Sequence, residues 1–556
     1  MTCSRGDFRC PSFAFGFLIL LFVLLQPLAY AEETSSGDKL RILYSSRFTF
    51  SEQGTPWVTV EIESGKTNAT IRSSGGLWIF PDGASGSKID GGQEFKLSAA
   101  RTTQAKTKEW TIVETLDSNK SEEIPARIQK WKKKGLKVKA FQVGTLFSVK
   151  GTVMDSRQTK IGVSPVAKGK GEAQSRVIAK KYSISTEVYE ELLKRPSGTI
   201  AAKNKHFGVE NASVLWFKPK GPKATIEVLG VKSGHGGSSQ KTRKENRNYL
   251  GWIYATVDKD GLLSLVNAVE ADDLLAGLVP SEMFPTAPLE ALKSQSIAAR
   301  TELIQKLGTR HIADPYLLCS SQHCQVYTGT GREHPRTTKA VNQTRGVVML
   351  NSDGGLVDAR YSAACGGHSE HKHNIWGGEH DSNLVGRMDQ KSTPKAFKNG
   401  VGHKNVAAFL KETKESYCSN TKFSKNRYRW NLSASQNDLK KSLAAYGVSV
   451  GKINRLTPIK RGISGRTVQL EVKGSNKTQM IYGDLKIRRA LGGLRSSLFV
   501  VESTRGADNG FVFSGAGFGH GVGMCQLGAI GMANAGKKHS TILPHYYKDV
   551  ILKELY

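Results

Sequence analysis

The chain has 556 residues, enough for about two to four domains with hydrophobic cores of ordinary size. It carries 80 lysines and arginines against 48 aspartates and glutamates, which gives a net charge of +32. A charge of this size favours binding to an anionic polymer. The sequence has no helix-turn-helix, zinc-finger or RNP-like pattern, which disfavours nucleic acid as that polymer.

The first 31 residues have the features of a secretory signal peptide. Arg5 and Arg9 precede an apolar run from Phe13 to Leu25, and Ala29-Tyr-Ala31 is a small-x-small cleavage site. We therefore expect a mature chain that begins at Glu32, has no transmembrane segment and is exported to the periplasm, cell wall or extracellular space. A retained N-terminal anchor is the alternative. Export favours an anionic envelope polymer over nucleic acid as the partner.

Residues 32–231 read as a β-rich N-terminal region. Residues 57–62 and 76–80 alternate apolar and polar side chains, which predicts antiparallel strands. Residues 109–140 predict a strand, a helix from about Glu123 to Lys134 and a second strand. Residues 232–248 are rich in glycine, serine and charge, which predicts a linker or a flexible insertion.

Residues 249–556 begin with two predicted strands, Tyr249–Val257 and Leu263–Glu270, paired across a turn at residues 258–261. A short helix over residues 271–278 should follow. The next helix is predicted to run from a cap at Thr286 to about Leu307, which places Glu282 in the turn ahead of it.

The segment Gly515–Ala529 alternates glycines with other residues and leaves His520 and Gln526 among its few hydrogen-bonding side chains. Such glycines are needed where a backbone approaches a ligand or another strand. A tightly packed turn explains the glycines alone equally well.

Four ordered blocks give the chain a family resemblance: VPSEMFPTAPLEALKSQSIAARTEL around Glu282, the segment around Tyr327, residues 361–368 with the following Trp376, and the glycine segment. Together they resemble the SpoIID/LytB family. The resemblance covers about residues 245–556 and implies a SpoIID-like catalytic region over residues 249–556. With the β-rich N-terminal region before it, the chain should have an α+β, β-rich fold. The charge and position of the N-terminal region lead us to expect that it contributes wall binding.

The same resemblance implies a peptidoglycan lytic transglycosylase with Glu282 as its catalytic acid. Such an enzyme cleaves MurNAc-β-1,4-GlcNAc bonds, and family precedent favours denuded glycan strands. The C6 hydroxyl of N-acetylmuramic acid attacks C1 to give a 1,6-anhydro product, so one carboxylate serves as acid and then base. A carboxyl beside apolar Met283 and Phe284 can keep its proton near neutral pH.

The resemblance also implies residues that bind the glycan, and Gln295 is the strongest of them. Arg300 is alternatively a structural ion-pair partner, and Tyr361 is alternatively part of the core. The sequence departs from the family pattern at Phe284 and at Glu302, where an aromatic residue is usual. The complete substrate-binding set comprises Lys293, Gln295, Arg300, Gln325, Tyr327, Tyr361, His520 and Gln526.

Five cysteines remain after Cys3 and Cys10 are removed with the signal peptide, so at least one is free or bound to metal. Cys319, His323 and Cys324, together with His311, supply the ligand types of a structural Zn²⁺ site. Some members of the family bind zinc through such a block. A Cys319–Cys324 disulfide is the rival interpretation in an oxidising compartment.

Two other functions compete with the transglycosylase. A non-catalytic peptidoglycan-binding protein that enhances an N-acetylmuramoyl-L-alanine amidase predicts binding without cleavage. A zinc hydrolase that uses the Cys/His block predicts chelator-sensitive hydrolysis, but the chain lacks an H-E-x-x-H pattern.

Overall fold

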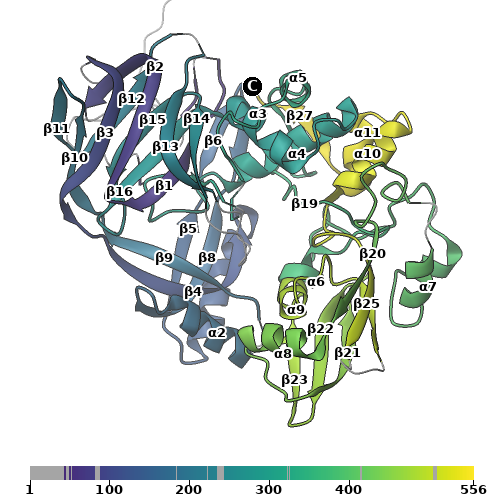
Figure 1. The fold of residues 1–556 in the computed structure, drawn as a ribbon. Helices are drawn as coiled ribbons and strands as arrows, with labels where there is room; N and C mark the ends of the chain where they lie inside the picture. The colour runs from purple at the N-terminus through teal and green to yellow at the C-terminus, as the bar shows by residue number, and fades with distance from the viewer. Residues whose placement is uncertain are drawn as a thin grey trace, which may run out of the picture. The chain divides into compact units, whose positions relative to one another are not determined.

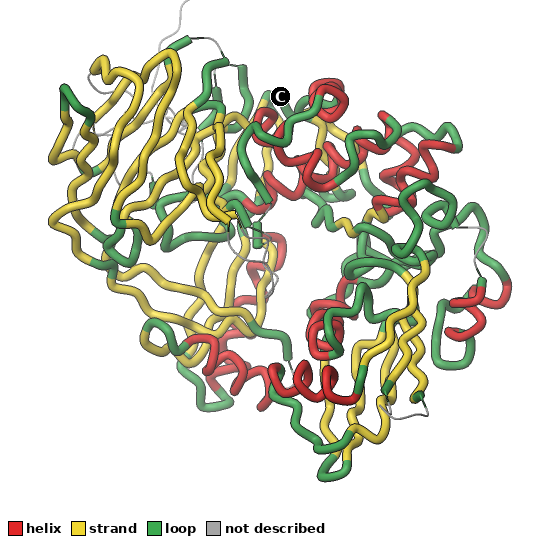
Figure 2. The backbone as a smooth tube through the Cα atoms, viewed as in Figure 1, coloured by secondary structure: helices red, strands yellow, loops and turns green. Residues whose placement is uncertain are grey.

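The fold is α+β and rich in strands, as predicted (Figure 1, Figure 2). The expected signal peptide, residues 1–31, and the predicted ligand Gln325 lie outside the part of the chain that is described. The computed structural model describes residues 43–44, 49–51, 53–81, 88–182, 184–221, 223–233, 243–321, 323–324, 326–412, 416–504 and 510–556.

The largest sheet among the described residues has eleven strands, in the order β11-β10-β3-β2-β12-β15-β16-β1-β17, with β13 paired to both β2 and β14. Its first strand buries Val58, Val60 and Ile62, which gives the period of two expected for a sheet with one face on a core. The strands are β1 Trp57–Lys66, β2 Asn68–Pro81, β3 Ile89–Thr103, β10 Ser197–Lys203, β11 Gly208–Ala212, β12 Val214–Pro219, β13 Ile226–Ser233, β14 Arg243–Tyr249, β15 Trp252–Val257, β16 Leu263–Glu270 and β17 Leu318–Cys319.

Strands from both sides of the predicted linker at residues 232–248 pair within this sheet. β12 pairs with β15, and β13 pairs with β14, which includes residues 243–248 of that segment. This pairing does not test the predicted domain boundary at residues 232–248, which stays a prediction.

A four-stranded sheet in the order β5-β8-β4-β9 lies between β3 and β10 in sequence and contains the predicted strand–helix–strand unit. Trp131, on α1, is buried in its core with Ile161 and Val163. The elements of this region are β4 Lys106–Asp117, η1 Ser118–Glu123, α1 Ile124–Lys132, β5 Val138–Val143, β6 Leu146–Val149, β7 Thr152–Asp155, β8 Gln158–Ala167, α2 Gly171–Tyr182 and β9 Glu187–Lys194.

The predicted hairpin is confirmed by the antiparallel pairing of β15 with β16, but the two helices after it have different bounds from those predicted. Helix α3, Ala271–Glu282, continues four residues beyond the predicted end and includes Pro280. Helix α4, Leu289–Lys306, begins after Pro288 and is not capped by Thr286. The residue before a proline is disfavoured in the helical conformation, so Ala287 favours a helix that starts after it.

Helix α4 is buried on nearly all sides because it is shared by two cores. Ala299 and Leu303 pack in the core of the large sheet, whereas Leu292 and Ile297 pack in a second core. This second core also contains Leu527 and neighbouring residues of the glycine segment. Figure 1 shows the helices gathered around α4. They are α5 Pro335–Gln343, α10 Gln526–Asn534 and α11 His539–Tyr546, besides α3.

The remaining elements form small sheets toward the C-terminus (Figure 1). None of the helices in the described ranges is both long and apolar enough to cross a bilayer. The sheets and their helices are β18 Val347–Leu350 with β27 Ile551–Glu554; β19 Tyr361–Ser362 with β26 Met524–Cys525; β20 Arg429–Ala434, β25 Phe511–Ala516 and β24 Phe499–Ser503; β21 Ile453–Arg461, β22 Thr467–Gly474 and β23 Thr478–Tyr482; and α6 Lys372–Trp376, η2 Lys395–Phe397, α7 Val406–Lys411, α8 Gln436–Ala445 and α9 Asp484–Ala490.

Candidate functional site

Glu282 is the last residue of α3 and not part of a turn ahead of α4, which corrects its predicted position. The side chain of Gln526, at the start of α10, fixes the backbone there. Its Nε2 donates to the Glu282 carbonyl oxygen at 2.9 Å and to Gln295 Oε1 at 3.0 Å. Gln295 is fully buried on α4. Three of the predicted residues, from three separate helices, therefore meet at one point.

The environment of Glu282 favours its protonated form. Burial raises the pKa of Glu282 from 4.5 to about 7, the negative charge of Glu302 adds to the rise, and the positive charge of Lys306 opposes it. A carboxyl with a pKa near 7 can both donate and accept a proton near neutral pH. This is the property that a single acid–base residue requires.

Glu302, which acts on Glu282, belongs to a group of paired charges. Glu302 pairs with Lys306 at 2.6 Å, and Lys306 Nζ also donates to the carbonyl oxygen of Cys324 at 2.6 Å. Arg360 Nη1 lies 3.8 Å from the same carboxylate oxygen that Lys306 contacts, Glu302 Oε1. The negative charge that acts on Glu282 is thus held in place by two cations.

Two further predicted ligands, Tyr361 and His520, are close enough to these charged residues to be affected by them. The parallel pair β19–β26 aligns Tyr361 with Met524, two residues before Gln526. Burial raises the pKa of Tyr361 well above its ordinary value, and the charges of Glu282 and Glu302 contribute to the rise. Burial, with nearby arginines, lowers the pKa of His520 to about 3, so its ring is neutral.

An exposed aromatic side chain lies beside His520. The Trp376 ring is 39 % exposed and its centroid is 4.9 Å from that of His520. The Arg360 guanidinium is 5.2 Å from the Trp376 centroid. Aromatic faces of this kind are available to sugar rings and other ligands with apolar faces.

Three predicted ligands make contacts within the protein. Arg300 is fully buried and donates to Asp272 Oδ1 at 3.0 and 2.8 Å, which supports its alternative as a structural ion-pair partner. Tyr327 is buried in the core of the large sheet and donates to Asn267. Lys293 pairs with Glu290 at 2.9 Å. Gln325 lies outside the described residues.

The glycines of the C-terminal segment allow close packing of the backbone. A Cβ on Gly521 would lie 2.3 Å from the buried guanidinium of Arg466, and one on Gly523 would lie 2.0 Å from the Arg360 carbonyl oxygen. Both glycines also have positive φ angles. The packed-turn interpretation of the glycines therefore holds at these positions, alongside the role of Gln526.

The four predicted metal ligands come together. One ligand atom each from His311, Cys319, His323 and Cys324 lies within 4.8 Å of the others. Cys324 Sγ is 3.3 Å from His311 Nε2, and His323 Nδ1 is 3.7 Å from both sulfurs. A tetrahedral zinc site has sulfur–nitrogen edges of about 3.6 Å. Asp314 Oδ2 lies 2.9 Å from His311 Nδ1, which leaves Nε2 directed toward the cluster.

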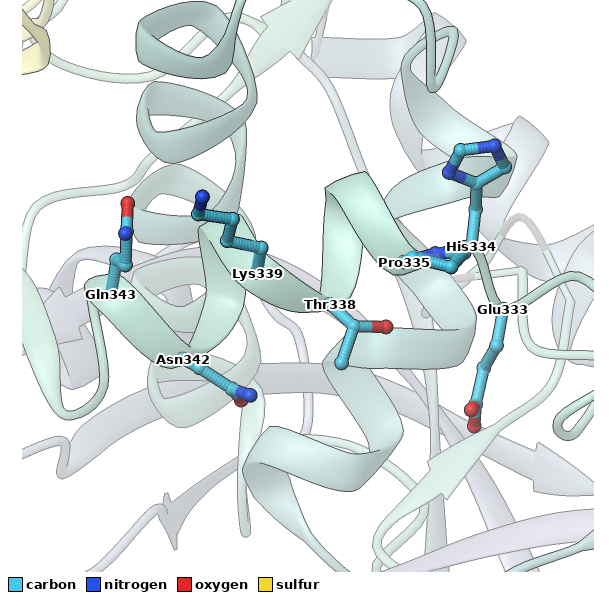
Figure 3. A pocket seen from close by; sticks show the side chains of 7 residues that line it. All are labelled: Glu333, His334, Pro335, Thr338, Lys339, Asn342 and Gln343. Carbon is cyan, nitrogen blue, oxygen red and sulfur yellow. The ribbon is translucent and has the colours of Figure 1, made fainter.

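A shallow hollow lies elsewhere, over α5 (Figure 3). It contains none of the predicted site residues. Its lining comes from α5 and the turn before it, namely Glu333, His334, Pro335, Thr338, Lys339, Asn342 and Gln343. The polar residues that converge on Glu282 identify the candidate site better than this hollow does.

Few features of the sequence indicate the charged residues near Glu282. Glu302 stood out as a departure from the family pattern, but Lys306 and Arg360 carried no signal. The relation between Glu302 and Lys306 is a helical spacing of four residues, which is common on exposed helices as well. Only the folded chain shows that the pair is buried.

Residues 259–350 match the family described as Stage II sporulation protein, SpoIID. This match confirms the predicted resemblance to the SpoIID/LytB family. Residues 370–523 match a second family, described as a domain of unknown function, DUF8618. The SpoIID match contains Glu282, Gln295 and the Cys/His cluster, whereas Tyr361 and Gln526 lie outside both matches.

Several curated proteins are similar in sequence to this chain. An uncharacterized protein of Brachyspira hyodysenteriae is 28% identical over 286 residues, which is 51% of this chain and 67% of that protein. The amidase enhancer of Bacillus subtilis is 28% identical over 345 residues, 58% of this chain and 46% of that protein. Stage II sporulation protein D of Bacillus amyloliquefaciens is 26% identical over 303 residues, 52% of this chain and 76% of that protein.

Proposed function

We propose that this protein is an exported peptidoglycan lytic transglycosylase with Glu282 as its acid–base residue. The observation that carries the proposal is the raised pKa of Glu282, about 7, because burial and the charge of Glu302 favour the protonated form of its carboxyl. The contacts of Gln526 with Glu282 and Gln295 support it, because they hold the end of α3 in one position.

In the proposed reaction, the protonated Glu282 carboxyl donates its proton to the glycosidic oxygen as the bond to C1 of N-acetylmuramic acid breaks. The C6 hydroxyl of the same sugar then bonds to C1 and gives its proton to the Glu282 carboxylate. The residue returns to its starting state, and the product is a 1,6-anhydro sugar. No water is consumed, so a second catalytic carboxylate is not needed, in contrast to the usual glycosidase scheme.

The substrate we propose is a glycan strand, denuded of stem peptides. Trp376, partly exposed beside His520, is positioned to stack on a sugar ring. The net charge of +32 supports attraction to the anionic cell wall, and we propose that the N-terminal region contributes to this binding. An N-acetylmuramoyl-L-alanine amidase would supply denuded strands and is the proposed functional partner.

We also propose that His311, Cys319, His323 and Cys324 hold a structural Zn²⁺. The donor set and its spacing fit zinc, and four protein ligands leave no position open for a catalytic water. Lys306 links this cluster to the site, since it donates to the Cys324 carbonyl and pairs with Glu302. Zinc, when bound, would therefore fix the charges that act on Glu282.

The test is mass spectrometry of denuded glycan strands after incubation with the protein. We expect anhydro-ended fragments from the wild type and none from Glu282→Gln, which keeps the side-chain shape but removes the proton donor. Glu290→Gln is the matched control, because Glu290 pairs with Lys293 and His539 and takes no part in the proposed reaction. Turnover by Glu282→Gln equal to that of the wild type would refute the assignment.

The second candidate function is a non-catalytic amidase enhancer. It is favoured by the 28% identity to the amidase enhancer of B. subtilis over 58% of this chain. In the same experiment it predicts intact strands that remain bound to the wild-type protein. Adding an amidase with intact peptidoglycan would then show faster release of stem peptides when this protein is present.

A further inference from the structure

A second cluster of metal-ligand atoms lies in the core that contains the glycine segment. The sulfurs of Cys365, Cys418 and Cys525 and a carboxylate oxygen of Asp389 all lie within 4.8 Å of one another. None of these residues is more than 1% exposed. The cluster is separate from the predicted Cys/His set, and sequence analysis assigned it no role.

The spacing within the cluster fits a metal better than a disulfide. Cys365 Sγ lies 3.7 Å from Cys418 Sγ. A disulfide bond joins its sulfurs at about 2.05 Å. Two thiolates on a tetrahedral Zn²⁺, each about 2.3 Å from the metal, are about 3.8 Å apart. The observed separation is therefore close to one edge of such a tetrahedron.

Hydrogen bonds orient the ligand atoms and support their negative charge. Cys525 Sγ accepts from the backbone N–H groups of Cys365 at 3.1 Å and Gly528 at 3.3 Å, the latter at the N-terminus of α10. Asp389 Oδ2 accepts from the Cys418 N–H at 3.0 Å, and Oδ1 accepts from the Tyr546 hydroxyl at 2.7 Å. Each carboxylate oxygen has a second lone pair, so one can still bind a metal.

The cluster joins segments that have little regular structure of their own. Cys365 follows β19, Cys525 ends β26, and Asp389 and Cys418 belong to the long connection between α6 and β20. In the described part of that connection, the helical elements are η2 and α7. A shared ligand set is an effective way to fix such a connection, because binding free energy then contributes to folding.

We propose that Cys365, Asp389, Cys418 and Cys525 bind Zn²⁺ in a closed structural site. Thiolates favour zinc over the hard cations Ca²⁺ and Mg²⁺, and four protein ligands complete its tetrahedral shell. The proposal also accounts for the odd number of cysteines, with two in the Cys/His cluster and three here. Because Cys525 precedes Gln526, a metal bound here would also fix the position of Gln526, which contacts Glu282. The proposed metal site does not depend on the proposed reaction.

The test is the metal content of the full chain, purified without chelator or reductant and measured by inductively coupled plasma mass spectrometry. We expect two zinc ions per chain. Cys418→Ser should lose one of them, Cys324→Ser should lose the other, and the double variant should bind none. Circular dichroism spectra show whether each variant retains its fold.

A thiol map of the wild type makes the test independent of how the variants fold. The chain is denatured with EDTA and no reductant, alkylated and digested, and the peptides with Cys365, Cys418 and Cys525 are examined by mass spectrometry. Complete alkylation together with two zinc ions supports the proposal. A disulfide-linked peptide pair, or free thiols with only the zinc that Cys324→Ser removes, would overturn it.

Discussion

The Gln526 side chain donates to the Glu282 backbone carbonyl at 2.9 Å, across 244 residues of sequence. This contact joins the glycine segment near the C-terminus to the end of α3, and the same amide reaches Gln295 on α4. The two blocks that stand out most in the sequence therefore meet at the backbone of Glu282. The glycines bring the backbone close, and Gln526 makes the contact.

Gln526→Met tests this relationship, because methionine keeps the side-chain volume but cannot donate a hydrogen bond. We expect the rate on denuded strands to fall about 10- to 100-fold, since Glu282 is then less well positioned. The unpaired acceptors should also lower the free energy of unfolding by about 1–2 kcal/mol. Gln436→Met is the control, since Gln436 bonds to Ile453 in a different core. A rate unchanged by Gln526→Met would remove the positioning role.

The pH dependence of the rate should report the pKa of Glu282. Its carboxyl must be protonated to act as the acid, so the rate should fall about tenfold per pH unit above about pH 7. Burial is the main cause of the raised pKa and Glu302 is the second, so Glu302→Gln should move this limb to lower pH. Removing Glu302 also leaves the charge of Lys306 unopposed, which acts in the same direction. If the alkaline limb of the pH–rate profile does not move in Glu302→Gln, Glu302 is excluded as a cause of the raised pKa of Glu282.

Ionising Glu282 should also destabilise the fold. Its pKa is about 7 in the folded chain and 4.5 in the reference state, so the folded state holds the proton more tightly between these values. Stability is then lost as the pH rises through that window, by up to about 3 kcal/mol. Glu282→Gln removes this loss and should be more stable than the wild type at about pH 8, with a smaller difference at about pH 5. Urea unfolding at both pH values measures the change.

Glu290→Gln provides a comparison of opposite sign. The bonds from Lys293 and His539 outweigh burial and lower the pKa of Glu290 to about 2. Its ionised form therefore stabilises the fold above about pH 4.5, and this contribution is lost only as the pH falls toward 2. The variant should be less stable than the wild type at both pH values used for Glu282. A gain in stability for both variants would point to an unspecific effect of removing acidic residues.

The sequence was sufficient to predict the parts of the site that depend on local pattern. The β15–β16 hairpin has a clear turn between two apolar strands, and the Cys/His cluster combines ligand types within a short segment. Gln526 stands out within the glycine segment, and Gln295 is predicted through the family resemblance. Each of these signals lies within a few neighbouring residues, so no knowledge of the fold was needed to recognise it.

The rest depends on packing between distant segments. Helix α4 is buried by two cores, so polar residues such as Arg300 lie inside the protein although the sequence allows them to face a ligand. The Cys365 cluster draws on residues as far apart as Cys365 and Cys525, which no spacing rule connects. The predicted start of α4 is wrong for a local reason. Pro288 disfavours a helical conformation at the residue before it, and this effect outweighs the preference of Thr286 for a capping position.

Asp314 should set the zinc affinity of the Cys/His cluster without being a ligand. Its carboxylate lies 2.9 Å from His311 Nδ1, so it orients the ring and supports the basicity of Nε2. Asp314→Asn keeps the shape but removes the charge, and we expect zinc affinity to fall about 10- to 100-fold with all four ligands still present. Competition with a chromophoric chelator measures the affinity, and Cys324→Ser identifies the signal of this cluster.

Asp260→Asn, which changes an exposed aspartate paired with Lys168, is the control and should leave the affinity unchanged. Equal affinities for Asp314→Asn and the wild type would show that the His311–Asp314 contact only stabilises the loop.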